Sequence, residues 1–384
     1  MLTNPFTPVF GGKPEVFFGR KELLAQFRTA LVDPSSENRA LFVTGTRGSG
    51  KTALLERLSQ LARAVQWRVI DLGPDRAVHT LVRELAGFDE ETRSLSPQVS
   101  VSVLGSGGSF GGVATSKTDR IDEADLTRVL LRACEQHPKG IMVNVDEIQK
   151  VPEDDVSLIC NAFQMASRKG YDVILVVAGL PYAHDEIIHY KGCTYMRRAR
   201  HAELGLLSWD DSIAAIRSAF AANRGLDAEE SVVEQLVQAS YGHPYMLQLL
   251  GYYLIVTLNE NGAAAGHHVS AAEAHVATNR AICAYEARAL QPLMSELSGA
   301  ERAYLLALSH ILDDDRVGKT SEVAFHLGKK PNAVTYLRDS LLRNGIVITA
   351  GRGLLMFNVP YLAGYVQKRE SEPSNLQLVR QWRV

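Results

Sequence analysis

The segment 45–52 (GTRGSGKT) constrains the fold more than any other part of the sequence. It matches the pattern G-x-x-x-x-G-K-[ST] and directly follows a short apolar run at 40–44 (ALFVT). Between a strand and a helix, such a loop lets successive backbone N–H groups curl around a phosphate, and the positive end of the helix faces the same anion. The motif therefore predicts a strand, a phosphate-binding loop and a helix in direct succession.

Three further apolar runs predict the other strands of a parallel sheet. Each is short, rich in β-branched residues and nearly continuous in apolar character, as in strands that are covered on both faces. Segments of helical period separate them, which is typical of βαβ units. We therefore expect an α/β fold, a three-layer parallel-sheet domain of the P-loop type. The runs lie at 67–72 (WRVIDL), 141–145 (IMVNV) and 173–177 (VILVV).

The strand signals stop after about residue 206. Residues 208 to 290 have the apolar periodicity of helices, and the order helix, helix, helix, hairpin follows, as in a winged helix-turn-helix. A glycine-rich stretch interrupts the first part; we interpret it as a surface insertion, with a partner-contacting hairpin as the alternative. The expected parts are a P-loop domain at 1–206 with the insertion at 94–119, a helical domain at 207–290, a winged helix at 291–370 and a tail at 371–384.

Composition and charge exclude several classes of protein. The 384 residues are 46% hydrophobic and 22% charged, which is typical of a globular chain. A net charge of −2 argues against nucleic-acid binding through overall charge, although a local basic patch remains compatible with it. The four cysteines are widely spaced, so neither a disulfide framework nor a zinc site is indicated. Without a membrane-span or signal-peptide pattern, we expect a cytoplasmic protein with no membrane partner.

Two motifs predict the binding of ATP or ADP with Mg²⁺. Lys51 is expected to reach the β- and γ-phosphates, and the Thr52 hydroxyl to ligate the magnesium. Asp146 and Glu147 end the apolar run 141–145, where Asp146 would complete the magnesium shell and Glu147 would polarise the attacking water. Alternatively, the two carboxylates only start the following helix. The expected phosphate-binding residues are Gly45, Thr46, Arg47, Gly48, Ser49, Gly50, Lys51 and Thr52.

With both motifs placed, the chain resembles the AAA+ and STAND P-loop ATPases, specifically those similar to archaeal and eukaryotic replication-initiator (origin-recognition) proteins. The resemblance extends over nearly the whole chain, including NPF at 4–6 and FFGRKEL at 17–23. It implies that a segment with Phe18, Gly19 and Arg20 lies over the adenine. It also makes the helical domain a lid.

Three other segments carry implications of the same resemblance. The run 240–248 (SYGHPYMLQ) is similar to the GxP motif of STAND lids, which implies contact of Pro244 and Tyr245 with the base. At the sensor-1 strand end, Ala178 stands where relatives usually have a polar residue, which implies slow hydrolysis. Arg197 and Arg198 stand where relatives carry an arginine that contacts the γ-phosphate. A basic surface turn is the alternative for these two arginines.

The C-terminal part has a basic surplus. From Lys319 onwards it holds ten Lys and Arg against four acids, a surplus of +6. On a winged-helix pattern this predicts contact with double-stranded DNA. The residues expected at the DNA are Lys329, Lys330, Asn332, Thr335, Tyr336, Arg338 and Arg352.

We therefore expect a slow Mg²⁺-dependent ATPase that acts as a nucleotide switch and whose winged helix binds duplex DNA. The alternative is a STAND-type signalling ATPase whose winged helix contacts a protein instead of DNA. A protein partner or self-assembly of the chain is a further expectation. A helper ATPase of a mobile element is a third, weaker hypothesis.

Overall fold

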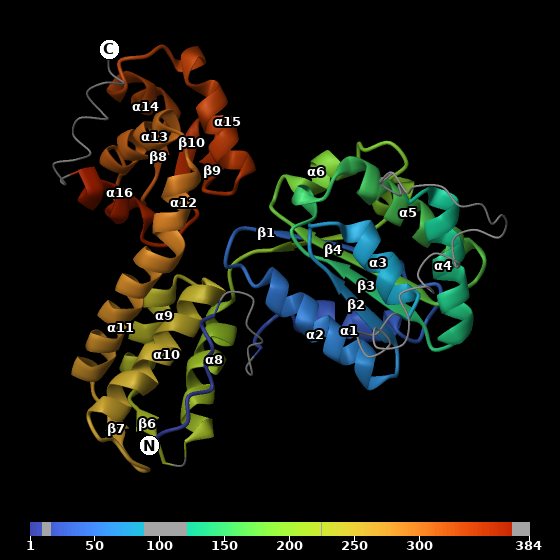
Figure 1. The fold of residues 1–384 in the computed structure, drawn as a ribbon. Helices are drawn as coiled ribbons and strands as arrows, with labels where there is room; N and C mark the ends of the chain where they lie inside the picture. The colour runs from blue at the N-terminus through green and yellow to red at the C-terminus, as the bar shows by residue number, and fades with distance from the viewer. Residues whose placement is uncertain (10–16, 88–120, 224, 371–384) are drawn as a thin grey trace, which may run out of the picture. The chain divides into compact units, whose positions relative to one another are not determined.

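The computed structural model describes residues 1–9, 17–87, 121–223 and 225–370 (Figure 1). The predicted insertion at 94–119 and the tail at 371–384 lie outside these residues. The described chain forms two compact units. One contains Lys21–Thr44 and Leu54–Glu203, and the other contains Met1–Arg20, Gly45–Ala53 and the described residues from Leu204 onwards. No helix among the described residues is long and apolar enough to span a membrane.

The first of these units is built on a five-stranded parallel sheet with the strand order β2-β3-β4-β1-β5. All four predicted strands are confirmed, and β1, β3 and β4 are buried at every residue, as their apolar composition predicted. The fifth strand was not predicted, because its sequence RHAEL has no apolar run and only alternate burial at the sheet edge. The strands are β1 (Ala40–Gly45), β2 (Arg68–Leu72), β3 (Ile141–Val145), β4 (Val173–Gly179) and β5 (Arg200–Leu204).

Helices cover the sheet on both faces, which confirms the three-layer arrangement. Alternate residues of the strands, such as Phe42 and Val143, form one core with α3, α4 and α5. Their neighbours Leu41 and Met142 are equally buried but face the other way, since side chains alternate along a strand. The helices are α1 (Lys21–Ala30), α2 (Lys51–Ala64), α3 (Ala77–Leu85), α4 (Glu123–Gln136), α5 (Glu153–Arg168), α6 (Ala183–Ile187) and α7 (Thr194–Arg197).

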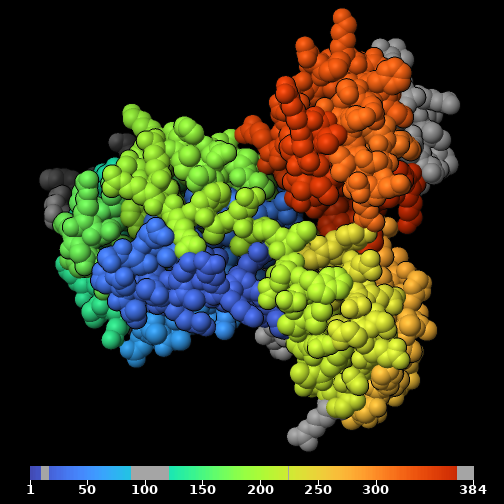
Figure 2. Space-filling view, turned by 180° about the vertical axis from the view of Figure 1, so that it is seen from behind, coloured from blue at the N-terminus to red at the C-terminus, as the bar shows by residue number. Residues whose placement is uncertain are grey.

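The second unit begins its helical part with four helices, three of which pack around α10. Ten of the 17 residues of α10 are buried, so this helix is the centre of the lid core. In the space-filling view of Figure 2 this part of the chain (yellow-green to orange) forms one compact body. The elements are α8 (Trp209–Ala222), β6 (Asp227–Ala228), α9 (Glu230–Ser240), α10 (Pro244–Glu260), β7 (His268–Val269) and α11 (Ala271–Tyr285).

The helix α11 continues through a π-helical turn at Glu286–Leu290 into α12 (Gln291–Glu296), so the chain has no break at the predicted boundary 290/291. That boundary stays a prediction. Helices, a three-stranded antiparallel sheet with the order β8-β10-β9, and a last helix follow. They are α13 (Gly299–His310), β8 (Gly318–Lys319), α14 (Thr320–His326), α15 (Thr335–Arg343), β9 (Val347–Gly351), β10 (Leu354–Phe357) and α16 (Leu362–Glu370).

This arrangement confirms the predicted winged helix, with two differences. The strand β8 is only two residues long and gave no sequence signal. The helix expected from Asn332 onwards begins at Thr335, because Pro331–Ala333 forms a separate 3₁₀ turn. Proline favours the first position of a helical turn, and here Pro331 begins the short 3₁₀ turn rather than α15.

The N-terminal segment runs along the lid and is fixed by paired hydrogen bonds. The Leu2 N–H donates to Asn259 Oδ1 over 2.6 Å, and Asn259 Nδ2 donates back to the Leu2 carbonyl over 3.1 Å. Thr3 and Asn223 form the same kind of pair, at 2.7 and 2.9 Å. Phe6 is then buried in the lid core with 2% of its surface exposed. The segment is therefore part of the lid domain rather than a loose extension.

The Phe6 ring occupies the place where Gly251 of α10 lacks a side chain. A Cβ at Gly251 would lie 2.4 Å from two ring carbons, whereas a Cβ at Gly364 of α16 would meet nothing within 4 Å. Overpacking a core costs about 1–3 kcal/mol, and alanine gains about 1 kcal/mol over glycine inside a helix. We expect Gly251→Ala to lower the midpoint of urea unfolding and Gly364→Ala to raise it. A rise for both variants would show that the Phe6 ring is not held at this position.

Candidate functional site

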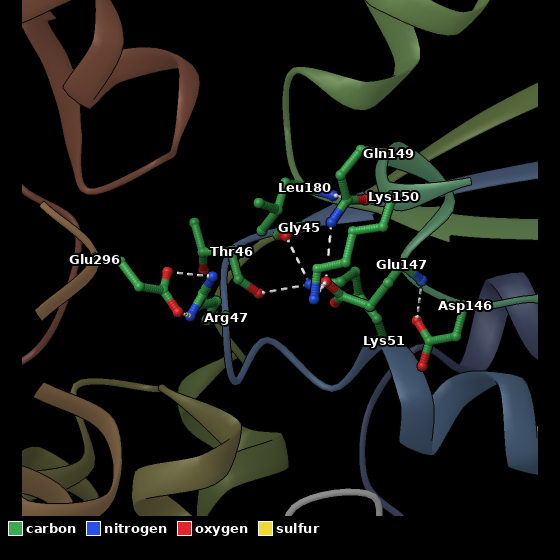
Figure 3. A network of polar contacts seen from close by, with 10 residues as sticks. All are labelled: Gly45, Thr46, Arg47, Lys51, Asp146, Glu147, Gln149, Lys150, Leu180 and Glu296. Carbon is green, nitrogen blue, oxygen red and sulfur yellow. Dashed lines mark hydrogen bonds and ion pairs between the residues drawn. The ribbon is translucent and has the colours of Figure 1, made fainter. Parts of the chain in front are cut away.

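The loop between β1 and α2 has the backbone of an anion-binding turn. Gly48 and Gly50 adopt φ angles of +77° and +93°, a region that residues with side chains rarely enter. Lys51 starts α2, is 6% exposed, and its Nζ donates to the carbonyls of Gly45 and Thr46 over 2.9 and 3.0 Å (Figure 3). The Ser49 hydroxyl is buried and has no hydrogen-bond partner among the described residues. A loop of this kind fits a phosphate ligand, which would supply the missing partner.

The start of α10 lies directly against this loop. The His243 ring nitrogen Nε2 lies 3.2 Å from the Arg47 carbonyl, and the Tyr245 N–H donates to the Gly48 carbonyl over 3.3 Å. A Cβ at Gly48 would lie 2.6 Å from His243 Cε1 and 3.1 Å from Tyr245 Cβ. The predicted lid motif therefore contacts the phosphate-binding loop itself. Sequence reasoning singled out Pro244 and Tyr245 but missed His243, which makes the closest approach.

Burial determines the protonation state of His243. The side chain lies within the protein, where loss of hydration lowers its pKa to about 4, and the nearby Lys51 charge acts in the same direction. The hydrogen bond to the Arg47 carbonyl opposes this shift without cancelling it. The imidazole is therefore neutral at neutral pH and donates through Nε2–H, since a carbonyl can only accept.

A second contact joins the loop to the end of α12. The Arg47 guanidinium binds Glu296 through two parallel contacts, 2.8 Å from NH1 to Oε1 and 2.6 Å from NH2 to Oε2 (Figure 3). Both side chains are about half exposed, so the pair contributes at most about 1 kcal/mol of stability. The two-point geometry nevertheless fixes where the side chain of Arg47 points.

The predicted adenine segment belongs to the same unit as the loop. Gly19 has a φ of +74°, and a Cβ there would lie 2.9 Å from Leu207 and 3.1 Å from Asp211. The Arg20 guanidinium donates to the Gly205 carbonyl, and burial lowers its pKa while the Asp211 carboxylate opposes the shift. Phe18 packs against the lid core. Gly19 and Arg20 therefore lie beside the first residues of the lid.

The acidic pair after β3 lies in the sheet unit. The Asp146 N–H donates to the Leu72 carbonyl of β2 over 3.1 Å, and Glu147 has a φ of +52°, an unusual conformation for a residue with a side chain. Glu147 Oε2 accepts from Gln149 Nε2 at 2.9 Å and lies 3.2 Å from Lys150 Nζ (Figure 3). Glu147 is the N-cap residue of a short 3₁₀ turn at Ile148–Lys150, and the following long helix, α5, starts only at Glu153.

The two candidate arginines differ in their surroundings. Arg197 Nε donates to the Ile188 carbonyl, which holds that side chain against its own unit. Arg198 follows α7 and is exposed, and its side chain makes no hydrogen bond or ion pair with any residue that the structure describes. Of the two, only the side chain of Arg197 is therefore held by a hydrogen bond among the described residues.

The winged helix places its predicted DNA-contacting residues on α15, the turn before it and the wing. Lys329, Lys330, Asn332 and Tyr336 are exposed, and Arg352 lies in the turn between β9 and β10. The Thr335 hydroxyl donates to the Pro331 carbonyl over 3.2 Å, and Arg338 pairs with Asp339 at 2.8 Å. These last two residues are thus engaged within the domain.

The fold and these two motifs are similar to those of P-loop ATPases of the AAA class. Residues 16–177 match the model of the AAA ATPase domain family. Residues 288–366 match a domain of unknown function (DUF8462). No curated protein matches the sequence.

The fold is similar to that of an archaeal ORC2 protein. The structure of Aeropyrum pernix ORC2 in ADPNP–ADP complexes is similar with a TM-score of 0.63 and 14% identity, over 97% of this chain and 95% of that one. Its ADP form gives a TM-score of 0.56 and 13% identity, over 94% and 96%. The predicted resemblance is thereby confirmed for the AAA domain and for the fold.

The neutral, buried His243 predicts a pH-dependent stability. Its folded-state pKa of about 4 lies below the usual value of 6.5, so its contribution is present above pH 6.5 and is lost as the pH falls towards 4. Between pH 7 and pH 5 this linkage removes about 2 kcal/mol of unfolding free energy. His243→Gln keeps a donor for the Arg47 carbonyl but cannot titrate. We expect urea unfolding of this variant to lose less stability over that range than the wild type; equal losses would contradict the assigned protonation state.

Proposed function

We propose that this protein is an ATP-dependent switch whose winged helix binds duplex DNA. The observation that carries the proposal is that one loop, Gly45–Lys51, contacts both the lid through His243 and the end of α12 through Glu296. When a phosphate binds in this loop, the contacts of the loop with His243 and Glu296 must adjust to it. Nucleotide binding can therefore change the state of the lid and of the helix that leads into the winged helix.

Each residue of the site has a proposed role. The loop residues Gly45, Thr46, Arg47, Gly48, Ser49 and Gly50 surround the phosphates with N–H groups, and Lys51 neutralises their charge. Thr52 and Asp146 offer the oxygen atoms that Mg²⁺ prefers, and such an ion usually keeps one or two protein ligands beside the substrate phosphates. The bound ion would withdraw charge from the γ-phosphate. Glu147 then accepts a proton from the attacking water.

Other predicted contacts stay proposals. Phe18, Gly19 and Arg20, together with Pro244 and Tyr245, would border the adenine. Arg198 is better suited than Arg197 to stabilise the transition-state charge, because Arg197 is already held by the Ile188 carbonyl. The four cysteines are free, which agrees with a cytoplasmic location.

A second candidate function is supported by contacts between the winged helix and the lid. The Tyr361 hydroxyl donates to the Ala239 carbonyl over 2.7 Å, and its ring lies 5.3 Å from that of Tyr241. Arg316 donates to the Tyr241 hydroxyl over 2.9 Å and lies over its ring. Contacts of this kind suit a clamp that ATP exchange releases for a protein partner, as in STAND-type signalling ATPases.

The nucleotide roles predict a separation of binding from turnover. Lys51→Ala should abolish ATP binding, because it removes the ammonium that meets the phosphates. Glu147→Gln should keep the ATP affinity within about twofold and lower kcat by about 100-fold or more, since it removes only the general base. Titration with a fluorescent ATP analogue and single-turnover hydrolysis measure the two effects. Unchanged ATP affinity in Lys51→Ala would contradict the proposed phosphate site.

The winged-helix proposal predicts salt-dependent DNA affinity. Arg352→Ala and Lys330→Ala should each weaken binding of a random-sequence duplex and reduce the salt dependence by about 0.9 per lost phosphate contact. Arg302→Ala removes the same charge from an exposed position on α13 and serves as the control. Fluorescence anisotropy at several salt concentrations, with ATP and with ADP, measures the slopes. No duplex binding at low salt would favour the second candidate function.

A further inference from the structure

Gln149 connects the Glu147 carboxylate to the end of strand β4. Its Nε2 donates to Glu147 Oε2 over 2.9 Å, and its Oε1 accepts from the Leu180 N–H over 3.3 Å (Figure 3). One amide group thus makes two directed contacts of opposite sense. These contacts join the segments that follow β3 and β4, which are adjacent strands of the sheet.

The backbone at the end of β4 is shaped around this side chain. A Cβ at Gly179 would lie 2.8 Å from Gln149 Oε1 and 2.7 Å from Ala183 Cβ. Only glycine therefore lets the strand approach the amide this closely. Because Glu147 adopts a φ of +52°, its backbone is in a conformation that carries strain, and contacts of its side chain help to maintain it.

The contacts of Glu147 leave one side of its carboxylate open. Among the described residues, both the Gln149 amide and the Lys150 ammonium meet Oε2, and no side chain donates to Oε1. When one oxygen of a carboxylate is held in place, the lone pairs of the other oxygen point in a fixed direction. Lys150 is 57% exposed, so its ammonium is hydrated and mobile, whereas Gln149 is anchored at both ends of its amide.

We propose that Gln149 is a positioning residue for ATP hydrolysis. It holds the Glu147 carboxylate so that Glu147 Oε1 faces the attacking water. This inference rests on the proposed function of Glu147. In the step concerned, the water oxygen bonds to the γ-phosphorus and the bond to the leaving ADP oxygen breaks. The water proton passes to Glu147. Gln149 does not touch the reacting atoms; it acts through the carboxylate that it orients.

Two variants of the full-length protein separate positioning from structural support. Gln149→Leu removes both contacts, whereas Gln149→Glu keeps an oxygen that accepts from the Leu180 N–H and loses the donor to Glu147. We expect both variants to lower kcat by about 10- to 100-fold with ATP affinity within about threefold of the wild type. Gln136→Glu makes the same chemical change at an exposed position of α4 and is the matched control. A wild-type kcat in Gln149→Glu would overturn the proposal.

A double-mutant cycle tests whether Gln149 acts through Glu147. In the Glu147→Gln background, Gln149→Leu should cause less than about a twofold further loss of turnover, because the group that it positions is already inactive. A further loss as large as in the wild-type background would overturn the positioning role. If Glu147→Gln alone leaves kcat unchanged, it is the proposed function of Glu147 that fails.

Discussion

The close approach of the lid to the phosphate-binding loop is the constraint on which the second unit depends. His243 and Tyr245 occupy the space that a side chain at residue 48 would need, so this residue must be glycine for reasons of packing as well as backbone conformation. The neutral imidazole of His243 donates a hydrogen bond to the Arg47 carbonyl and does not bring a charge next to Lys51. One histidine thus makes a buried interface possible beside a cation. The loop, the lid and the end of α12 are consequently joined by direct contacts within one unit.

The sequence predicted those parts of the fold that depend on local patterns. Strands β1, β3 and β4 are buried along their whole length because they are covered on both faces, and their nearly continuous apolar character can be recognised from the sequence. The edge strand β5 escaped prediction because RHAEL exposes alternate residues and resembles a loop. The two-residue strand β8 exists only through its pairing with β10, a contact that no local pattern encodes.

The residues of the candidate site also fall into two groups: those that local sequence patterns predict and those that depend on contacts distant in the sequence. Motif spacing predicts roles for Lys51, Asp146 and Glu147, because the proposed roles need fixed residue types after fixed strands. His243 and the Arg47–Glu296 pair were missed, since their partners are about 200 residues or more away in the sequence. Gln149 was missed for another reason: a glutamine two residues after an acidic pair has no meaning until the end of β4 is placed beside it.

The uninterrupted helical run from Ala271 to Glu296 has a further consequence. Its 26 residues span about 39 Å at 1.5 Å per residue. The His243 ring, which contacts the phosphate-binding loop, lies 5.8 Å from the ring of Tyr285, just before the π-helical turn. The residue that contacts the loop therefore also packs against this helical run near its middle. In a stiff rod of that length, a tilt of about 5° moves one end relative to the other by about 3 Å. Such a lever converts the small adjustment of a phosphate-binding loop into a displacement comparable to the reach of a side chain.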